Sequence, residues 1–390
     1  MSVSGVLPFL LVLCEICTAG AVVGCIFTLL ACYLVVRFSG AGEPRSGAQP
    51  PVTVLKPLHG AEPSLSARLA QFCEQDYAGP VQLVFGTPRE AAAAVVRELK
   101  AEFPDQAIDL VVDRRSHGSN GKVSNLVNML PHAHCETLVL SDSDIVVGPD
   151  YLRSVAALLE QPHVGAVTCL YYGIGEGLWS RLSALTINSN FLPQAILAAS
   201  LGLVQSCCGA TIALRRSMLE RIGGFAAFTD VLADDYAIGA ALRSFGYEVV
   251  TAPFLVGHRC FEASLRQLVR HQMRAARTIR SIEPIGYAGS IITHPWPLAL
   301  LGALSGSGTA GLVAAAALAS RLALCLCVAR RFGLARQDYW LVPIHDTIAF
   351  AVYLAGLFGT TVHWQGSDYR VTPDGMLIEH DAEDLTMGRL

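Results

Sequence analysis

Residues 136–144 read ETLVLSDSD, a short apolar run followed at once by two aspartates that flank one serine. An uninterrupted apolar run of this length is typical of a strand buried on both faces of a parallel sheet. Asp142 and Asp144 follow the end of that strand, where two like charges repel each other unless a cation lies near them. The stretch therefore predicts a buried strand that ends at a site for a positively charged ligand.

The more polar middle of the chain, between residues 50 and 289, repeats this pattern. Strand-like runs alternate with helix-like patterns, which predicts a doubly wound α/β domain with a mostly parallel sheet. In such sheets ligands bind beyond the carboxyl ends of the strands, and the two aspartates follow such an end. The other strand-like runs are PPVTVLKPLHG (50–60), VQLVFG (81–86), AIDLVVD (107–113) and HVGAVTCL (163–170), and the helix-like ones are 62–75, 89–103 and 121–130.

The composition of the whole chain indicates a membrane protein. Of its 390 residues 52% are hydrophobic and only 15% are charged, which is too apolar for an ordinary soluble protein. The 28 basic and 32 acidic residues are scattered and give a net charge of −4, so nucleic acid is not an expected partner. Half of the 12 cysteines lie in apolar segments, where cysteine behaves as a small hydrophobe, so neither a disulfide framework nor a zinc site is expected.

Three apolar segments predict membrane-spanning helices. Residues 7–36 contain a single charge and exceed the roughly 20 residues that span a bilayer. Arg37 and Arg45 follow and, by the positive-inside rule, hold the next segment in the cytoplasm. Residues 295–329 are long for one helix and short for two, and residues 339–363 form the third segment. The glycines of the second segment mark either a break or a packing seam of small residues, and they are Gly302, Gly306, Gly308 and Gly311.

These segments divide the chain into four predicted parts. One N-terminal and about two or three C-terminal transmembrane helices flank the α/β domain, and the bilayer is an expected partner. The parts are an N-terminal anchor (1–39), a cytoplasmic domain (40–290), a C-terminal transmembrane region (291–363) and a polar tail (364–390).

Asp142 and Asp144 are the first candidates for ligand binding. Two carboxylates so close together are unfavourable unless a divalent ion neutralises them. Hard oxygen ligands suit Mg²⁺ or Mn²⁺, which commonly hold substrate phosphates as well. The alternative is a solvated turn or a helix cap. Other motifs favour the metal site because they add groups suited to a phosphate and a nucleoside.

A basic, glycine-rich turn supplies the candidate phosphate-binding groups. The stretch RSHGSNGKVSNLVNML (115–130) leads into a helix that carries Lys122. Backbone N–H groups at a helix start, together with a lysine, favour an anionic phosphate. Upstream, Asp109 and Asp113 bracket the end of a strand, where a carboxylate accepts hydrogen bonds from a base or a ribose. Spacing does not choose between these two aspartates, and either is also compatible with a plain loop.

Asp234 and Asp235 begin a helix-like stretch, and one of them is a candidate general base. A base must lie within hydrogen-bond reach of the acceptor hydroxyl and be ionised when that hydroxyl arrives. A carboxylate beside a nucleotide–metal centre satisfies both conditions. The alternative is that the two acids only stabilise the N-terminus of the helix.

Two further segments are suited to phosphate or lipid. One helix-like stretch carries arginines at spacings of four, four and three, which places them on one face. That face either grips a diphosphate or lies at an anionic membrane surface. Residues 177–204 are unusually apolar and form either an interfacial helix that guides a lipid or a buried core helix. The arginines are Arg266, Arg270, Arg274 and Arg277.

The order of these motifs resembles the ceramide glucosyltransferase family of inverting GT-A glycosyltransferases. Within that family the chain is most similar to the bacterial hopanoid-biosynthesis-associated glycosyltransferases. The resemblance covers most of residues 50–290 and extends into THPWPLALL (293–301). It rests on PVTVLKPLHG, FCEQDY, GKVSNLVNMLP, TIALRR, ERIGGF, LADDYA and RTIR, which keep their order along the chain.

The resemblance implies roles for individual residues. Asp142 and Asp144 match the metal and nucleotide-sugar motif, so the implied cofactor is Mg²⁺ or Mn²⁺. Asp235 matches the catalytic base. The implied nucleotide-binding residues are Lys56, Asp109 or Asp113, Lys122, Asp142 and Arg270.

Residues 271–275 match the family's Gln/Arg-x-x-Arg-Trp motif, with Arg274 at the arginine position. Arg274 is therefore a candidate catalytic residue that stabilises charge on a leaving diphosphate, with help from Arg270. His271 replaces the Gln or Arg of the motif. Ala275 replaces its tryptophan, which removes an aromatic wall for the sugar or the acceptor.

The function that the resemblance implies is that of a membrane-bound inverting glycosyltransferase. The expected donor is a UDP-sugar, UDP-N-acetylglucosamine by analogy, and the expected acceptor is the hydroxyl of a membrane lipid, a hopanoid polyol. The expected location is the cell inner membrane, as a multi-pass protein with a cytoplasmic catalytic domain. The alternatives are a ceramide glucosyltransferase that uses UDP-glucose, a polysaccharide synthase, and a membrane scaffold without catalysis.

Overall fold

The computed structural model describes residues 3–39, 49–202, 206–335, 338–364, 367–372 and 375–379. Arg45 and the part of the predicted polar tail beyond residue 379 lie outside the described residues. The chain forms two compact units. The sheet unit consists of Ser39–Tyr172, Gly202–Arg259 and His363–Leu390, and the helical unit consists of Met1–Phe38, Gly173–Leu201 and Cys260–Val362.

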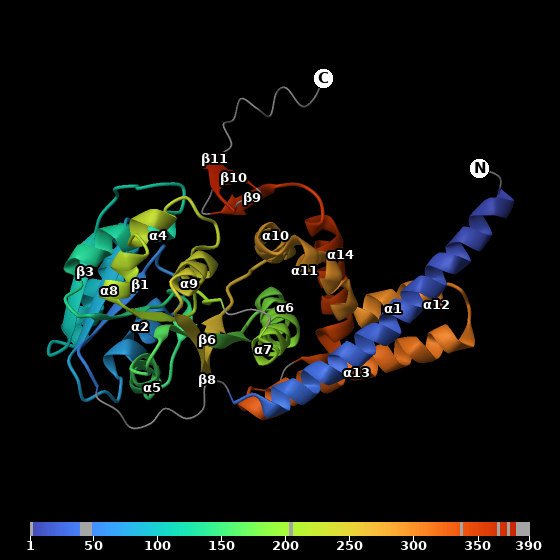
Figure 1. Ribbon diagram of the computed structural model, residues 1–390, viewed down its shortest axis with the longest axis horizontal. Helices are drawn as coiled ribbons and strands as arrows, with labels where there is room; N and C mark the ends of the chain where they lie inside the picture. Colours follow the sequence, from blue (N-terminus) through green and yellow to red (C-terminus); the bar gives the residue numbers. More distant parts are fainter. Residues whose placement is uncertain are drawn as a thin grey trace, which may run out of the picture. The chain divides into compact units, whose positions relative to one another are not determined.

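The sheet unit is built on an eight-stranded sheet with the order β3-β2-β1-β4-β7-β6-β8-β5 (Figure 1). β3, β2, β1 and β4 are parallel, so that Val52 of β1 pairs with both Val81 and Thr137. β7 is antiparallel to β4 and β6, and β5 is antiparallel to β8. The predicted α/β fold is confirmed, and the parallel part comprises the four strands around β1. The strands of this sheet are β1 (Val52–Pro57), β2 (Val81–Thr87), β3 (Ala107–Val112), β4 (Thr137–Leu140), β5 (Ile145–Val146), β6 (Val164–Ile174), β7 (Ile212–Arg215) and β8 (Glu248–Arg259). A smaller sheet contains β9 (Thr361–Trp364), β10 (Ser367–Val371) and β11 (Leu377–Glu379).

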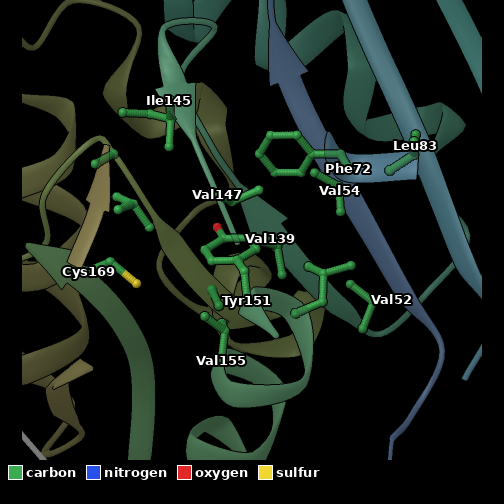
Figure 2. Close-up of a cluster of buried hydrophobic side chains, with 14 of the residues drawn as sticks. Val52, Val54, Phe72, Leu83, Val139, Ile145, Val147, Tyr151, Val155 and Cys169 are labelled. Carbon is green, nitrogen blue, oxygen red and sulfur yellow. The ribbon is translucent and has the colours of Figure 1, made fainter. Parts of the chain in front are cut away.

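Helices cover both faces of this sheet. Successive residues of a strand point to opposite faces, so Val54 joins the core beneath α2, α3 and α5, and Leu55 joins the core beneath α4, α8 and α9. Figure 2 shows the first core, in which the rings of Phe72 and Tyr151 meet edge to face with centroids 5.8 Å apart. Because both faces are apolar, the parallel strands are uninterrupted apolar runs in the sequence. The helices are α2 (Leu65–Cys73), α3 (Glu90–Glu102), α4 (Gly121–Met129), α5 (Tyr151–Leu159), α8 (Arg216–Arg221) and α9 (Asp234–Ser244).

The strand order places a reversal of the chain between β1 and β4. From β1 the chain winds outward to β2 and β3, and then returns through α4 to the other side of β1. Ligands of doubly wound sheets bind at such a reversal, beyond the carboxyl ends of the strands. β1 ends at Pro57 and β4 ends at Leu140, so Lys56 and Asp142 lie at this point.

The end of the described chain returns to the sheet unit. β10 and β11 are antiparallel, and with β9 they form a second, three-stranded sheet. The Leu377 N–H donates to the Asp230 carbonyl at 2.7 Å, and the Leu232 N–H donates to the Gly375 carbonyl at 3.1 Å. The hairpin therefore supports the loop that leads into α9.

The helical unit contains the apolar segments. α1 packs along α7, α12 and α13, and α10 packs against α6, α11 and α14. By length and composition alone, two helices could cross a membrane, over Pro8–Arg37 and Gly308–Phe332. α14 has 15 residues, about 22 Å at 1.5 Å per residue, which is less than the roughly 30 Å of a bilayer core. The number of C-terminal spans therefore stays a prediction. The helices are α1 (Val3–Arg37), α6 (Leu178–Thr186), a π-turn η2 (Ile187–Phe191), α7 (Leu192–Ser200), α10 (Leu265–Ile282), α11 (Pro284–Gly289), α12 (Pro295–Ala303), α13 (Gly308–Phe332) and α14 (Val342–Gly356).

Within the apolar segment 177–204, residues 178–200 form α6, the π-turn and α7. Leu182 and Leu185 of α6 are buried in one cluster with Leu268 of α10 and Val342 of α14. Of the two interpretations of this segment, a buried core helix is the one that describes α6.

The glycines of the second apolar segment mark both a break and a seam. Gly306, with φ +72°, lies between α12 and α13 in the left-handed region that favours glycine. A Cβ at Gly302 would lie 2.2 Å from Oγ1 of Thr18 in α1, and a Cβ at Gly24 would lie 2.5 Å from the Ile292 carbonyl oxygen. The close approach of α1 to α12 and to the turn before it therefore depends on glycine.

Gly24→Ala tests this seam. We expect it to destabilise the protein by about 1–3 kcal/mol, because the added methyl group meets a backbone carbonyl. Gly311→Ala is the matched control, since it also lies in an apolar helix and nothing lies within 4 Å of an added Cβ. Thermal unfolding in detergent should show a lower midpoint for Gly24→Ala and an unchanged or slightly higher one for Gly311→Ala. Equal midpoints for the two variants would contradict the seam.

Candidate functional site

The loop that carries the two aspartates is fixed through its backbone. The carbonyl groups of Asp142, Ser143 and Asp144 each accept a hydrogen bond from outside the loop. Because the three carbonyls are consecutive, the loop cannot turn without breaking at least one of these bonds. The donors are Lys56 Nζ to Asp142 at 2.8 Å, Arg68 Nε to Ser143 at 3.0 Å and the Arg259 N–H to Asp144 at 2.9 Å.

Lys56 supports the loop from behind. Its side chain is fully buried, and Nζ lies 3.9 Å from the centroid of the Phe72 ring. Burial lowers the pKa of Lys56 to about 7, although Asp144 and Asp142 oppose this shift. The ammonium already donates to the Asp142 carbonyl, and it lies 3.3 Å from Ser141 Oγ. The geometry therefore makes Lys56 a support for the aspartate loop, and its contact with a nucleotide stays a prediction.

Arg68 and Glu62 support the same loop from α2 and the turn before it. Arg68 is 3% exposed, and its Nη2 lies 2.7 Å from Glu62 Oε2. Glu62 Oε1 accepts a hydrogen bond of 2.9 Å from the Ser143 hydroxyl. The serine between the two aspartates is thus held by its side chain as well as by its carbonyl.

His258 lies beside Asp144. Its Nε2 is 3.2 Å from Asp144 Oδ2, and its ring stacks on Tyr171 with centroids 5.3 Å apart. Burial opposes ionisation of Asp144, but His258 and Lys56 outweigh it and hold the pKa of this carboxyl below its usual value. The other carboxylate oxygen, Oδ1, is buried and has no hydrogen-bond partner in the described part of the chain.

Lys122 joins Asp142 to α9. Its Nζ lies 2.9 Å from Asp142 Oδ1 and 3.2 Å from Asp234 Oδ2. Burial favours the neutral amine, but the charges of Asp142, Asp234 and Asp235 outweigh it and raise the pKa of Lys122. Burial and the charge of Asp144 raise the pKa of Asp142 against the effect of Lys122, although its side chain is 33% exposed and water moderates the shift.

Asp235 and Asp142 flank the same glycine. Gly209 N–H donates to Asp235 Oδ2 at 2.9 Å, and the Tyr236 N–H donates to Oδ1 at 2.8 Å. A Cβ at Gly209 would lie 2.9 Å from Asp142 Oδ2 and 3.6 Å from Asp235 Oδ2. The absence of a side chain at residue 209 therefore leaves the space between the two carboxylates open. Burial and the charge of Asp234 raise the pKa of Asp235 to about 6, against the effects of Lys122 and the two N–H donors.

The structure separates Asp109 from Asp113. Asp113 directly follows the end of β3, at the carboxyl edge of the sheet, where a hydrogen bond from the Arg115 side chain lowers its pKa. Asp109 lies inside β3, and its Oδ2 accepts a hydrogen bond of 2.6 Å from Nε2 of Gln82, near the amino end of β2. Asp113 is therefore the one at the edge where ligands of such sheets bind.

The structure brings Lys56, Lys122, Asp142, Asp144 and the α9 acids together in the sheet unit. The predicted arginines belong to the helical unit, where Arg270 and Arg274 lie on α10. Arg277, predicted on the same face, donates to the Thr361 carbonyl, so this end of the arginine stripe is used within the helical unit.

Three residues of the site were not found by sequence reasoning. Gly209 has no motif of its own, and its only signal is its place just before a strand-like run. His258 and Arg68 are polar residues at the end of a strand and on an amphipathic helix, and such residues are more often on the surface.

The residues at this point fit a divalent cation. Asp144 Oδ1 is a buried carboxylate oxygen without a hydrogen-bond partner among the described residues, and such oxygens are the donors that Mg²⁺ and Mn²⁺ prefer. No group of three or more His, Cys, Asp or Glu side chains suited to hold a metal occurs among those residues. A cation held by Asp142 and Asp144 would therefore complete its ligands with water and phosphate oxygens, as Mg²⁺ commonly does.

A solved structure shares this fold. The mannosyltransferase PcManGT from Pyrobaculum calidifontis, in complex with GDP-Man and Mn²⁺, matches with a TM-score of 0.55 at 23% identity. The match covers 90% of this chain and 99% of that one. Together with the sheet topology, this defines the class as a glycosyltransferase fold of the GT-A type. The chain also matches the family model Glycosyl transferase family 21 over residues 16–377, and it belongs to that family.

Two of the curated relatives show the kinds of protein that this chain is similar to. Ceramide glucosyltransferase 1 of Caenorhabditis elegans is 26% identical over 237 residues, which are 58% of this chain and 50% of that protein. An N-acetylglucosaminyltransferase of Sinorhizobium fredii is 24% identical over 245 residues, which are 60% of this chain and 58% of that protein. The chain thus spans about half the length of the curated relatives it matches.

Gly209→Ala tests the geometry between the two carboxylates. The added methyl group would lie 2.9 Å from Asp142 Oδ2, so we expect that carboxylate to move. Changes around metal ligands typically cost about 10–100-fold in metal affinity, and we expect Mn²⁺ to bind at least tenfold more weakly, measured by calorimetry. Gly148→Ala is the control, because nothing lies within 4 Å of its added Cβ. Normal Mn²⁺ binding by Gly209→Ala would contradict a metal site at this glycine.

Proposed function

We propose that this protein is a membrane-bound inverting glycosyltransferase that moves a sugar from a UDP-sugar to the hydroxyl of a membrane lipid. The observation that carries the proposal is the pair Asp142 and Asp144, which lies where the strand order reverses between β1 and β4. Asp235 and Asp142 lie beside the same glycine, Gly209. Membership of glycosyl transferase family 21 supports the reaction class. The two long apolar helices support attachment to a membrane.

In this proposal Asp142 and Asp144 hold Mg²⁺ or Mn²⁺ against the diphosphate of the donor, and His258 orients Asp144. The ion supplies positive charge to the leaving diphosphate. The complex of PcManGT with GDP-Man and Mn²⁺ supports such a pairing of nucleotide sugar and metal. Lys122 lies close enough to Asp142 to meet the same phosphates, and Asp113 stands at the edge where a nucleoside would lie.

Asp235 is the proposed general base. Two backbone N–H groups fix its carboxylate, and a pKa near 6 lets it be ionised at neutral pH while it still accepts a proton. It takes the proton of the lipid hydroxyl while the oxygen attacks the anomeric carbon, and the bond to the diphosphate breaks. A single displacement of this kind inverts the anomeric centre, in contrast to the two-step retaining route. Arg270 and Arg274 keep their predicted part in stabilising the charge on the departing diphosphate.

UDP-N-acetylglucosamine is the proposed donor and a hopanoid polyol the proposed acceptor. The relatives named N-acetylglucosaminyltransferase support this donor, and the hopanoid rests on the resemblance of the motifs alone. A second candidate is a ceramide glucosyltransferase that uses UDP-glucose, which the two relatives from Caenorhabditis elegans support. The inner membrane, with the sheet unit in the cytoplasm, is the proposed location, and the basic residues Arg37 and Arg45 that follow the first apolar segment in the sequence support this orientation.

Transfer of radiolabelled sugar tests the function. The purified protein is given UDP-N-acetylglucosamine or UDP-glucose, each with bacteriohopanetetrol or with ceramide, in Mn²⁺ or Mg²⁺ and in chelator. We expect a labelled hopanoid from UDP-N-acetylglucosamine, and no label when the metal is removed. Label on ceramide from UDP-glucose would favour the second candidate. No labelled lipid in any combination would contradict the proposed acceptor class.

The pH profile and Asp235→Asn test the base. Because the pKa of Asp235 is raised, the carboxyl is protonated and inactive below about pH 6, so kcat/KM should rise with pH and level off above that value. Asp235→Asn should bind UDP nearly as well as the wild type but lose about 100-fold or more in transfer. Asp76→Asn is the control, because this carboxylate is exposed and pairs with the exposed Arg153. A flat profile down to pH 5, or normal transfer by Asp235→Asn, would remove Asp235 from this role.

A further inference from the structure

An ion pair is buried inside the helical unit. Arg321 of α13 and Asp346 of α14 are 3% and 2% exposed. Arg321 Nε donates to Asp346 Oδ2 at 2.7 Å, and Nη2 donates to Oδ1 at 2.9 Å. Replacing a buried ion pair by apolar residues is often neutral or stabilising, so stability alone is a weak reason for its presence. Ionisable residues among apolar helices more often serve a specific arrangement or function.

The same arginine binds the π-turn that follows α6. Arg321 Nη1 donates to the Ser189 carbonyl at 2.9 Å, and Nη2 donates to Asn190 Oδ1 at 2.6 Å. A π-turn interrupts the regular helical hydrogen bonds, and such turns are frequent at functional sites. Arg321 therefore joins three elements, namely α13, α14 and the turn between α6 and α7.

A chain of hydrogen bonds continues from this pair to α10. His345 Nδ1 lies 2.9 Å from Asp346 Oδ1, and since a carboxylate only accepts, Nδ1 carries the proton. His345 Nε2 lies 2.9 Å from Thr186 Oγ1, and in the neutral ring it accepts from this hydroxyl, which also lies 3.1 Å from the Leu182 carbonyl of its own helix. Thr186 Oγ1 in turn accepts from Gln272 Nε2 of α10 at 2.8 Å. His345 is 1% exposed, so this chain of hydrogen bonds is shielded from water at its centre.

Gln272 lies on the buried side of α10. The buried residues of this helix are Leu268, Gln272 and Ala276, which recur every four positions and form one row. At 100° per residue, about 200° separate Gln272 from both Arg270 and Arg274, so the two arginines lie on the opposite side of the helix. Gln272 is the polar member of an otherwise apolar row. A single polar residue at such a position can fix the register of a helix, as a buried asparagine does in coiled coils.

We propose that the hydrogen bonds that join Asp346, His345, Thr186 and Gln272 fix the rotation of α10 about its axis. This rotation sets the direction in which Arg270 and Arg274 point. The four residues are positioning residues, and they act on the reaction only through the two arginines. An apolar row alone would let α10 turn or slide with little change in buried area. The bond from Gln272 to Thr186 favours one rotation, because any other would leave the buried Nε2 without this acceptor, while Oε1 has no hydrogen-bond partner among the described residues. This inference rests on the proposed role of Arg270 and Arg274 in binding the diphosphate.

Thr186→Val tests the inference because it removes the hydroxyl and keeps the shape of the side chain. Thr186→Ser restores the hydroxyl, and Thr347→Val is the matched control, since Thr347 is exposed and its hydroxyl donates to the Pro343 carbonyl of its own helix. Amide hydrogen exchange of the purified protein in detergent reports on each helix, and calorimetry with UDP and Mn²⁺ reports on the arginines. If Thr186→Val does not accumulate as folded protein, Gln272→Met replaces it.

We expect Thr186→Val to exchange about tenfold faster in residues 265–282 and to keep the wild-type exchange of α13 and α14, because the Arg321–Asp346 pair is intact. UDP binding should weaken by about tenfold, and Thr186→Ser and Thr347→Val should behave like the wild type. In a protein that carries both Arg270→Ala and Arg274→Ala, Thr186→Val should cause no further loss.

Two other results are distinguishable. Unchanged exchange of α10 in Thr186→Val, or a loss of UDP binding that adds in full to the double arginine variant, would overturn the inference. Faster exchange of α10 with normal UDP binding by both Thr186→Val and the double arginine variant would support the positioning of α10. That result would instead overturn the proposed role of the two arginines in the transfer reaction.

Discussion

The fixed backbone of the loop from Asp142 to Asp144 is the constraint on which the candidate site of the sheet unit depends. The two carboxylates, separated by one residue, repel each other, and three consecutive carbonyls of their loop accept hydrogen bonds from Lys56, Arg68 and the Arg259 N–H. The charged groups beside the two side chains then give the two carboxyls different pKa values. The pKa of Asp144 lies below its usual value and that of Asp142 lies above it. A divalent cation would meet one acid that is already ionised and a second that ionises as it binds.

The topology of the sheet explains why the other groups meet at this loop. The carboxyl ends of β1 and β4 are neighbours, and α4 returns across the same edge. Asn120 links the two segments that carry Lys122 and Asp235, because its Nδ2 donates to the Val231 carbonyl at 2.8 Å and its Oδ1 accepts from the Val123 N–H at 3.0 Å. The glycine-rich turn, the start of α4 and the loop before α9 therefore form one hydrogen-bonded assembly. A shift in any of these segments would move both the ammonium group of Lys122 and Asp235, the proposed base.

Periodicity and strand ends made the parallel strands, the aspartate pair and the acids of α9 predictable from the sequence, because these signals are local. The rest depends on contacts between residues far apart in the chain. Asp109 and Asp113 belong to one strand-like run, and the observed end of β3 at Val112 and the pairing of Asp109 with Gln82 separate them. Gly209 matters because of two carboxylates that lie far from it in sequence. The sequence did not decide whether the glycines near residue 305 mark a break between helices or a packing seam. In the fold Gly306 lies at the break between α12 and α13, and Gly302 lies in the seam with α1.

The two units use buried charge in opposite ways. In the sheet unit Asp144 keeps a buried oxygen without a hydrogen-bond partner among the described residues, and in the proposed function this oxygen meets the metal ion. In the helical unit Arg321 and Asp346 use their polar atoms on each other, on the π-turn and on His345. A network of this kind gains little from a ligand at the ion pair, because a new partner would have to displace bonds that are already made. Its value lies in the arrangement of helices that makes these bonds together, and in the proposal the rotation of α10 follows from that arrangement.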